Sequence, residues 1–180
     1  MKAKPERRWN MSTLGQLLAQ SKAKQGKSEY SVEVVNNETD GVFYLYFDNF
    51  NELEEILDHE DATFSLQGFF TSEYEIMKVG INQIQSIIEI IEGEFPKHAT
   101  MEVYIELIDN GFAQWDNVEK FFEDNFVCEY INDEQFGKEI AEREEIIKDE
   151  LSRKYWDYKK FGQDKQSEYP IMLGLAFRSS

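Results

Sequence analysis

Side chains that could perform acid–base, metal or nucleophilic chemistry are few and widely separated in this chain. The two histidines, His59 and His98, lack a partner at the His-x-x-x-His spacing that places two metal ligands on one helix face. The single cysteine, Cys128, alternates with apolar residues, which favours a buried thiol in a strand over a nucleophile. No Gly-rich phosphate loop and no Gly-x-Ser-x-Gly motif is present. The sequence therefore predicts no enzyme activity, no cofactor and no metal site.

Carboxylates are the abundant reactive groups, and they outnumber the cations. The 180 residues contain 36 Asp and Glu against 19 Lys and Arg, a net charge of −17. Residues 1–27 hold seven Lys and Arg and one acid, so they carry +6 and the remaining chain carries −23. Residues 28–77 contain thirteen acids and no Lys or Arg. Because phosphate contacts need basic residues, direct binding of nucleic acid is not expected.

The composition is that of a folded protein. Hydrophobic residues make up 41% and aromatic residues 14% of the chain, enough for a core. A single cysteine fits a reducing compartment. No apolar run reaches the ~20 residues that span a bilayer, and the N-terminal residues lack the apolar core of a signal peptide. We therefore expect a soluble, intracellular protein without a membrane partner.

The first part of the chain alternates in hydrophobicity as strands do. Segments 30–35 and 42–47 flank a turn-rich linker, which predicts a hairpin, and a helix at 51–60 precedes a third strand at 62–70. Ahead of them, residues 12–23 predict only a short helix. The basic residues before the hairpin are open to three interpretations: a frayed tail, an arm that docks on the chain's own acidic body, or an arm that touches another partner.

The middle of the chain has helical spacing. Isoleucines recur every three or four residues between Gly80 and Gly93, which predicts one helix, and a second follows Pro96 and ends near residues 110–111. The helical spacing of these isoleucines predicts that they are core residues. These patterns predict an elongated α+β chain of small modules: a basic extension at 1–27, an α+β module at 28–67, a helical module at 68–111 and an acidic α+β module at 112–180.

The last module is predicted to contain two helices between strands. Asp116 is a candidate cap for a helix at 117–124, and a strand is expected at 126–131. A long acidic helix should start at Asn132, with Gln135 three residues on as in a capping box. Its buried side would comprise Phe136, Ile140, Ile147 and Leu151, and a final strand is expected at 171–177.

An aromatic stretch, Tyr155-Trp156-Asp157-Tyr158-Lys159-Lys160-Phe161-Gly162-Gln163-Asp164, lies between that helix and the final strand. Asp157 can cap a short helix in which Tyr158 and Phe161 share a face and which Gly162 can end. The stretch resembles the C-terminal signature of the ArdA antirestriction family, in which an aromatic-Gly-Arg-Asp run follows an acidic helix. Here Gln163 replaces the usual Arg, and the resemblance extends over about residues 31–177.

This resemblance implies a function without chemistry. ArdA proteins are DNA mimics of phages and mobile elements that dimerise and occupy the DNA-binding groove of type I restriction-modification enzymes. It therefore implies a cytoplasmic inhibitor in a bacterial host, acting in evasion of host defence. The partner-binding acidic surface would comprise Asp48, Glu52, Glu54, Glu55, Asp58, Glu60, Asp61, Glu119, Glu123, Asp124, Glu134, Glu139, Glu142, Glu144, Glu145, Asp149 and Glu150. Homodimer contacts are expected at Tyr155, Trp156, Tyr158 and Phe161.

The alternative is an acidic regulatory or adaptor protein that binds a basic partner through one acidic helix. A mimic spreads its binding energy over many weak, screened contacts, whereas an adaptor helix concentrates it in a few residues. The two interpretations therefore differ in how binding responds to neutralising separate pairs of acids.

Overall fold

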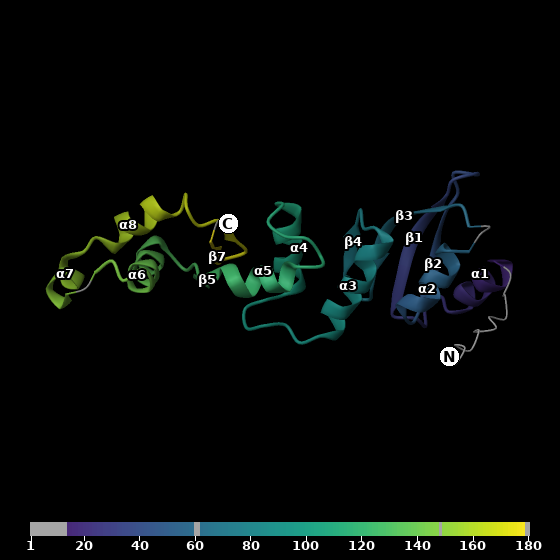
Figure 1. Ribbon diagram of the computed structural model, residues 1–180, viewed down its shortest axis with the longest axis horizontal. Helices are drawn as coiled ribbons and strands as arrows, with labels where there is room; N and C mark the ends of the chain where they lie inside the picture. The colour runs from purple at the N-terminus through teal and green to yellow at the C-terminus, as the bar shows by residue number, and fades with distance from the viewer. Residues whose placement is uncertain (1–13, 60–61, 148, 179–180) are drawn as a thin grey trace, which may run out of the picture. The chain divides into compact units, whose positions relative to one another are not determined.

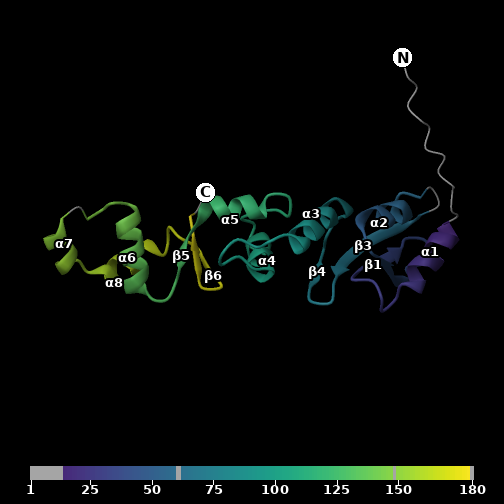
Figure 2. The same ribbon diagram turned by 90° about the horizontal axis from the view of Figure 1, so that it is seen from below.

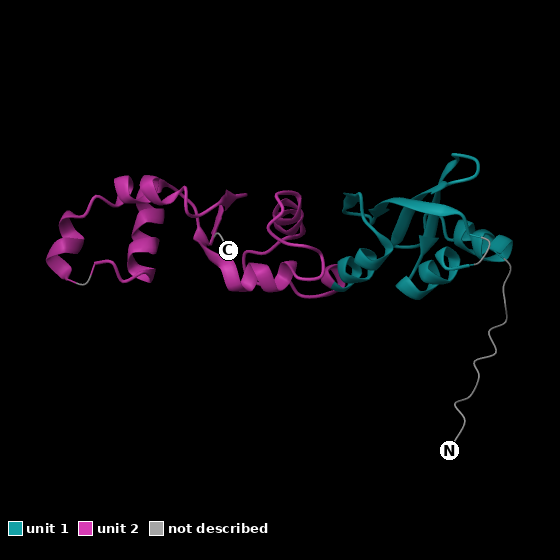
Figure 3. Ribbon diagram, turned by 45° about the horizontal axis from the view of Figure 1, so that its top comes forward, with its two compact units in different colours: residues 1–89 teal, residues 90–180 magenta. Residues whose placement is uncertain are grey.

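Helices and two antiparallel sheets make up the computed structural model, which confirms the α+β class (Figure 1). The structure describes residues 14–59, 62–147 and 149–178. Their contacts divide the chain into two compact units, residues 1–89 and 90–180 (Figure 3). The boundary between them falls inside the segment expected to form a helical module. No helix within the described residues is long and apolar enough to cross a membrane.

The first unit is built on a four-stranded antiparallel sheet in the order β2-β1-β3-β4. Its strands are β1 (Tyr30–Asn36), β2 (Val42–Phe47), β3 (Phe64–Phe70) and β4 (Glu75–Met77). The predicted hairpin and third strand are confirmed, while β4, only three residues long, was not predicted. The hairpin turn is closed by the N–H of Asn36, which donates to the carbonyl oxygen of Gly41 at 2.9 Å.

Alternate residues of β1 form the centre of this unit's core. Tyr30, Val32 and Val34 are buried, as the period of a half-covered strand requires. Helix α2 (Phe50–Leu57) adds Leu53 and Ile56, and Asn49 caps it by accepting from the N–H of Glu52. Full burial of each such aliphatic side chain is worth about 1.5–3 kcal/mol. The helix was predicted at 51–60, and it ends before Asp58.

Helix α1 (Leu14–Ala23) packs against β2 and also contacts α2. Leu17 and Ser21 are its buried residues. Of the three interpretations of the basic extension, this arrangement matches docking on the chain's own body for residues 14–23. Residues 1–13 lie outside the described residues.

Two helices of the middle region occur where the isoleucine and methionine spacing placed them. They are α3 (Ile81–Glu92) and α4 (Met101–Asp109). Thr100 caps α4, and Gly111 takes a positive φ of 77° just beyond its end. The predicted cap Asp116 is wrong for α5 (Val118–Asn125). Asn117 occupies the cap position, but its side chain turns back to accept from the N–H of Gln114.

The small sheet of the second unit has the order β5-β7-β6. Its strands are β5 (Phe126–Glu129), β6 (Ile171–Met172) and β7 (Leu175–Phe177). The single strand predicted at 171–177 is wrong, because the chain reverses at Leu173 and Gly174, whose φ values are 48° and 77°. Two consecutive positive φ angles make a tight hairpin turn.

The long acidic helix predicted from Asn132 is also broken into two. Asn132 caps α6 (Asp133–Arg143) by accepting from the N–H of Gln135, which confirms the predicted start. The helix ends before Glu144, Glu145 takes a φ of 49°, and α7 (Glu150–Tyr155) begins after the cap Asp149. Leu151, predicted to be buried, is 71% exposed. Asp149 caps a new helix, so Leu151 belongs to α7 and does not continue the buried side of α6.

Helix α8 (Tyr158–Lys165) lies beside α6 (Figure 2). Asp157 caps it as predicted, accepting from the N–H of Lys160 at 3.0 Å. The prediction that Gly162 ends this helix is wrong. A Cβ at Gly162 would overlap the carbonyl of Asp133, and one at Gly137 would overlap the carbonyl of Tyr158. The two glycines therefore let the α6 and α8 backbones touch.

Candidate functional site: an acidic interface

The negative charge is unevenly distributed over both units. Residues 1–89 carry fifteen acids and eight basic residues, a net charge of −7, and residues 90–180 carry twenty-one and eleven, a net of −10. Within the second unit, residues 90–135 hold twelve acids and two lysines, whereas residues 136–180 hold nine of each sign. The module predicted to be acidic, residues 112–180, carries a net charge of −6, and all of that excess lies before residue 136.

In the first unit, predicted site residues gather on and around α2. Glu54, Glu55 and Asp58 are exposed, because Leu53 and Ile56 hold the opposite face against the core. Asp48 and Glu52 lie at the start of the helix. Glu60 and Asp61 lie outside the described residues.

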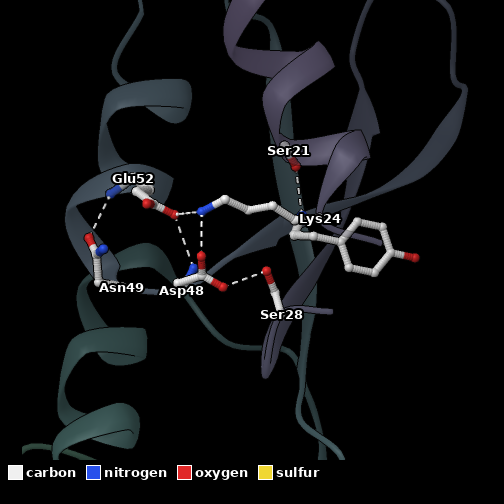
Figure 4. Close-up of polar contacts among 7 residues, drawn as sticks. Ser21, Lys24, Ser28, Asp48, Asn49 and Glu52 are labelled. Carbon is white, nitrogen blue, oxygen red and sulfur yellow. Dashed lines mark hydrogen bonds and ion pairs between the residues drawn. The ribbon is translucent and has the colours of Figure 1, made fainter. Parts of the chain in front are cut away.

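Lys24 forms ion pairs with two of these carboxylates (Figure 4). Its Nζ lies 2.7 Å from an Oδ of Asp48 and 2.5 Å from an Oε of Glu52, and the hydroxyl of Ser28 donates to Asp48 at 2.6 Å. We call these four residues the Lys24 latch. Hydrogen bonding to Asp48 and Glu52 raises the pKa of Lys24, and bonds from Lys24 and Ser28 lower the pKa of Asp48. The latch fastens the end of α1 to α2, so these carboxylates are less available to a partner.

In the second unit, α5 presents a further group of acids. Glu119, Glu123 and Asp124 are exposed, and Glu119 and Glu123 are one helical turn apart. The first two line a recess of about 330 Å³, which Glu94 and Asp116 also border. The buried hydroxyl of Tyr104 has no hydrogen-bond partner, and burial, with the charges of Glu119 and Glu123, raises the pKa of Tyr104 to about 12.

Helix α6 exposes a third group. Glu134 and Glu142 are exposed and Glu139 is half-buried, and all three border a shallow groove of about 390 Å³ with Asn132, Gln135 and Lys138. Lys138 also lies over the ring of Tyr158, 5.8 Å from its centroid. The lining of this groove therefore contains three carboxylates and one ammonium group.

Two of the predicted site residues after α6, Glu144 and Asp149, form hydrogen bonds or ion pairs within their own unit. Glu144 accepts from the hydroxyl of Tyr169 and pairs with Lys165 at 3.5 Å. Asp149 caps α7, where its bonds with Ser152 lower the pKa of its carboxyl. Glu145 and Glu150 are exposed. The predicted group at 144–150 therefore does not form one continuous acidic helix face.

A carboxylate that was not predicted as functional, Asp133, lies at the centre of the α6–α8 contact. It accepts from the hydroxyl of Tyr130 at 2.5 Å, from Gln163 at 2.8 Å and from Gln166 at 2.5 Å. Bonds from Tyr130 and Gln163 lower the pKa of Asp133. Gln163, where the ArdA pattern has Arg, thus donates to a structural carboxylate within its own unit.

The four predicted dimer contacts divide into two pairs. Tyr155 is 77% exposed and Trp156 38%, whereas Tyr158 and Phe161 are half-buried. Trp156 meets Phe161 edge to face, with ring centroids 5.9 Å apart, and Phe161 packs against the core around Phe136. Phe161 is therefore anchored in its own unit, while Tyr155 and Trp156 are exposed, as is Leu151 four residues before Tyr155.

The histidines and the cysteine are not brought together. His98 pairs with Glu129 through its Nδ1 at 2.8 Å and stacks on Phe126, and Cys128 is a half-buried free thiol whose pKa is raised by burial. No group of three or more potential metal ligands occurs among the residues that the structure describes.

In comparisons with known proteins, the chain matches no family model, no curated protein and no solved structure.

Proposed function

We propose that the protein is a DNA mimic that inhibits a type I restriction-modification enzyme by presenting exposed carboxylates to the basic residues of its DNA-binding groove. The observation that carries the proposal is the run of exposed acids on α2 and α5 in a chain region with few cations. The enzyme class comes from the resemblance of residues 158–164 to ArdA proteins. The action needs no catalytic chemistry.

The charge density on α2 is of the right order for mimicry. Eight residues of helix extend over about 12 Å, a length on which duplex DNA carries about seven phosphate charges. Helix α2 with Asp58 presents four carboxylates over this length, one of them held by Lys24. About half the phosphate density is thus offered, which supports attraction to a cationic groove through a long-range field.

The structure narrows the set of carboxylates that a partner would meet. Glu144 is bonded to Tyr169 and Lys165, and Asp48 and Glu52 share Lys24 in the Lys24 latch, so these three carboxylates are already engaged within the chain. The remaining described site residues are exposed or half-buried acids on the four helices α2, α5, α6 and α7 and on the segments after α2 and α6. They are Glu54, Glu55, Asp58, Glu119, Glu123, Asp124, Glu134, Glu139, Glu142, Glu145, Asp149 and Glu150.

A homodimer through α7 belongs to the same proposal. Leu151 and Tyr155 are four residues apart and therefore share one face of α7, where they are 71% and 77% exposed. Large exposed apolar side chains are common interface anchors. In this role Tyr155 and Trp156 contact the partner copy, and Phe161 supports Trp156 from within its own unit.

The test is competition with duplex DNA for a purified type I restriction-modification enzyme, measured at several salt concentrations. Because screening acts over about 8 Å at physiological ionic strength, affinity should fall steeply as salt rises. Three double variants on separate helices are compared: Glu54→Gln with Asp58→Asn, Glu119→Gln with Glu123→Gln, and Glu139→Gln with Glu142→Gln. The charge-preserving control exchanges Glu54→Asp with Asp58→Glu.

Each double variant should weaken binding by about threefold to tenfold, and combining them should multiply the losses, because each exposed contact is worth under about 1 kcal/mol. The control should bind as the unaltered protein does. Simultaneous binding of DNA and protein, or an affinity that is independent of salt, contradicts the proposal. Complete loss of binding with the α6 pair alone identifies the adaptor alternative instead.

A further inference from the structure

Strand β2 forms an outer edge of the first sheet. The strand register shows which of its N–H and C=O groups point toward β1 and which point outward. The register pairs Val34 with Phe43, and the N–H of Asn36 donates to Gly41, so the odd-numbered residues of β2 bond to β1. The main-chain groups of Val42, Tyr44 and Tyr46 therefore point away from β1. The N–H of Tyr46 donates to the buried hydroxyl of Ser21 at 2.7 Å, which agrees with this phase.

Ser21 satisfies one of these three outward positions. In the described part of the chain, Val42 and Tyr44 have no strand on their outer side, and the residues themselves are 59% and 45% exposed. Strand edges with open N–H and C=O groups are templates for an added strand, and several peptide-binding domains capture ligands in this way.

A groove lies beside this open edge. It has a volume of about 420 Å³, with one wall formed by residues 43–46 of β2 and the other by Leu18 and Lys22 of α1 and by Gln25 just after that helix. The lining is mostly apolar, including Leu18 and Phe43. A groove of this size and character accepts a large apolar side chain of a ligand whose backbone pairs with the edge.

The charge at the rim indicates what else such a ligand carries. Lys22 is exposed and makes no ion pair with any residue between 14 and 59 or elsewhere in the described chain. Lys24, two residues on, is held by the Lys24 latch and does not border the groove. The groove thus has an uncompensated ammonium group in a protein that is otherwise acidic, which favours a single carboxylate on the ligand.

We propose that the edge of β2 and helix α1 form a docking groove for an extended segment of another protein. The segment adds as a strand at Val42 and Tyr44, places one large apolar side chain between α1 and β2, and sets a carboxylate against Lys22. This interaction uses none of the carboxylates on α2, α5 or α6, so it is independent of DNA mimicry and its test is separate.

The probe is a display library of random ten-residue peptides, selected on the full chain. An enriched peptide is synthesised with a fluorescent label, and its Kd is measured by anisotropy while amide spectra map its contacts. Val42→Pro removes an outward N–H without breaking a bond to β1, so affinity should fall at least about tenfold. Val42→Thr keeps this N–H and should change affinity by less than about twofold.

A charge pair of variants provides the second arm. Lys22→Glu should weaken the peptide about fivefold, whereas Lys27→Glu makes the same change in net charge at an exposed lysine outside the groove and should leave affinity unaltered. If Val42→Pro disturbs the fold, Lys22→Glu against Lys27→Glu decides the question.

Any one of four outcomes overturns the proposal. The library yields no specific peptide, or the selected peptides bind Lys22→Glu as well as the unaltered chain, or amide shifts map away from Val42 and Tyr44. Self-association through this edge, seen as a doubled mass that Val42→Pro abolishes, would likewise identify a second copy as the occupant and overturn it.

Discussion

The two units fasten a peripheral helix to their cores in different ways. In the first unit, α1 is held by Ser21, which accepts from the edge of β2, and by the Lys24 latch at the surface. In the second, α8 is held against α6 by the contact of Gly137 and Gly162 and by the bonds that converge on Asp133. One attachment depends on polar contacts at the helix end, and the other depends on the absence of two side chains.

This difference sets how each attachment responds to mutation and to solvent. Close backbone contact is insensitive to salt but tolerates no added atom, because interiors are packed as densely as organic crystals. A surface ion pair tolerates substitution, since it contributes little, but it responds to salt and pH. The predictions below test this contrast, beginning with the largest expected effect.

The largest effect is expected at the α6–α8 contact. Gly137→Ala places a Cβ against the backbone of Tyr158, which cannot rotate away as a side chain can. The second unit should lose about 2–3 kcal/mol of unfolding free energy, despite the better helix propensity of alanine. Urea unfolding followed by amide signals of each unit measures this.

Gly80→Ala is the matched control, because its Cβ meets only the Gln83 side chain at 3.8 Å. It should change stability by less than about 0.5 kcal/mol. Equal effects of the two substitutions would show that α6 and α8 do not touch through their backbones.

An intermediate effect is expected at Ser21. Ser21→Ala leaves the N–H of Tyr46 without its acceptor at a helix–strand contact, so the first unit should lose about 1–2 kcal/mol. The same urea experiment measures it, with Ser72→Ala at an exposed turn as the control. An unchanged unfolding midpoint for Ser21→Ala would mean that water replaces the hydroxyl without cost.

The smallest effect is expected at the Lys24 latch. Lys24→Met should cost less than about 1 kcal/mol, because the pair is partly exposed, and the loss should shrink as salt is added. Lys27→Met, an exposed lysine outside the latch, is the control. A loss that persists undiminished in high salt would contradict an electrostatic attachment.

The pH dependence of the latch has a definite sign. The pKa of Lys24 is raised in the fold, so its contribution is complete below the unfolded value and is lost as pH rises through the folded value. The pKa of Asp48 is lowered, so its contribution is present above the unfolded value and is lost as pH falls through the folded value. The difference between Lys24→Met and the unaltered chain should therefore be largest between about pH 4 and pH 10.

Local patterns in the sequence predicted most of the elements. The alternation around residues 36–41 gave the hairpin, and the spacing between Gly80 and Gly93 gave α3 with its bounds. These elements are set by periodicity and by residues next to them in the chain. The cap Asn132 is likewise set by local sequence, because it accepts from the N–H of Gln135, only three residues further along the chain.

The predictions that were wrong concern positions where a tertiary contact, a second helix cap or an unusual turn overrides the local sequence pattern. A glycine near the end of a helical segment predicts a helix end, yet Gly162 lies inside α8 and allows close packing against α6, which no local pattern reveals. Leu151 continues the apolar spacing of α6, but a new cap at Asp149 starts a separate helix before it. The turn at Leu173 places a leucine at positive φ, which turn statistics do not anticipate.

For the candidate site, the sequence predicted where acidic residues are concentrated, but it did not predict which of them bond to other side chains of the chain. Lys24 and Glu52 are 28 positions apart, and Glu144 and Tyr169 are 25 apart. Ion pairs and hydrogen bonds over such separations depend on the tertiary fold. Glu54 on α2 and Asp58 just after it, and Glu119 and Glu123 on α5, are exposed as predicted, because the opposite helix faces carry the apolar residues that the core needs.

The position of Cys128 in β5 has a consequence for measuring motion. Burial raises the pKa of its thiol, so little reactive thiolate is present while the β5–β7 pairing is intact. Alkylation at neutral pH should therefore become faster when this small sheet opens, because opening exposes the half-buried thiol and removes the burial that raises its pKa. Because the chain has one cysteine, the labelling rate reads a single place. Changes in the alkylation rate of Cys128 therefore report the opening of the sheet formed by β5, β6 and β7.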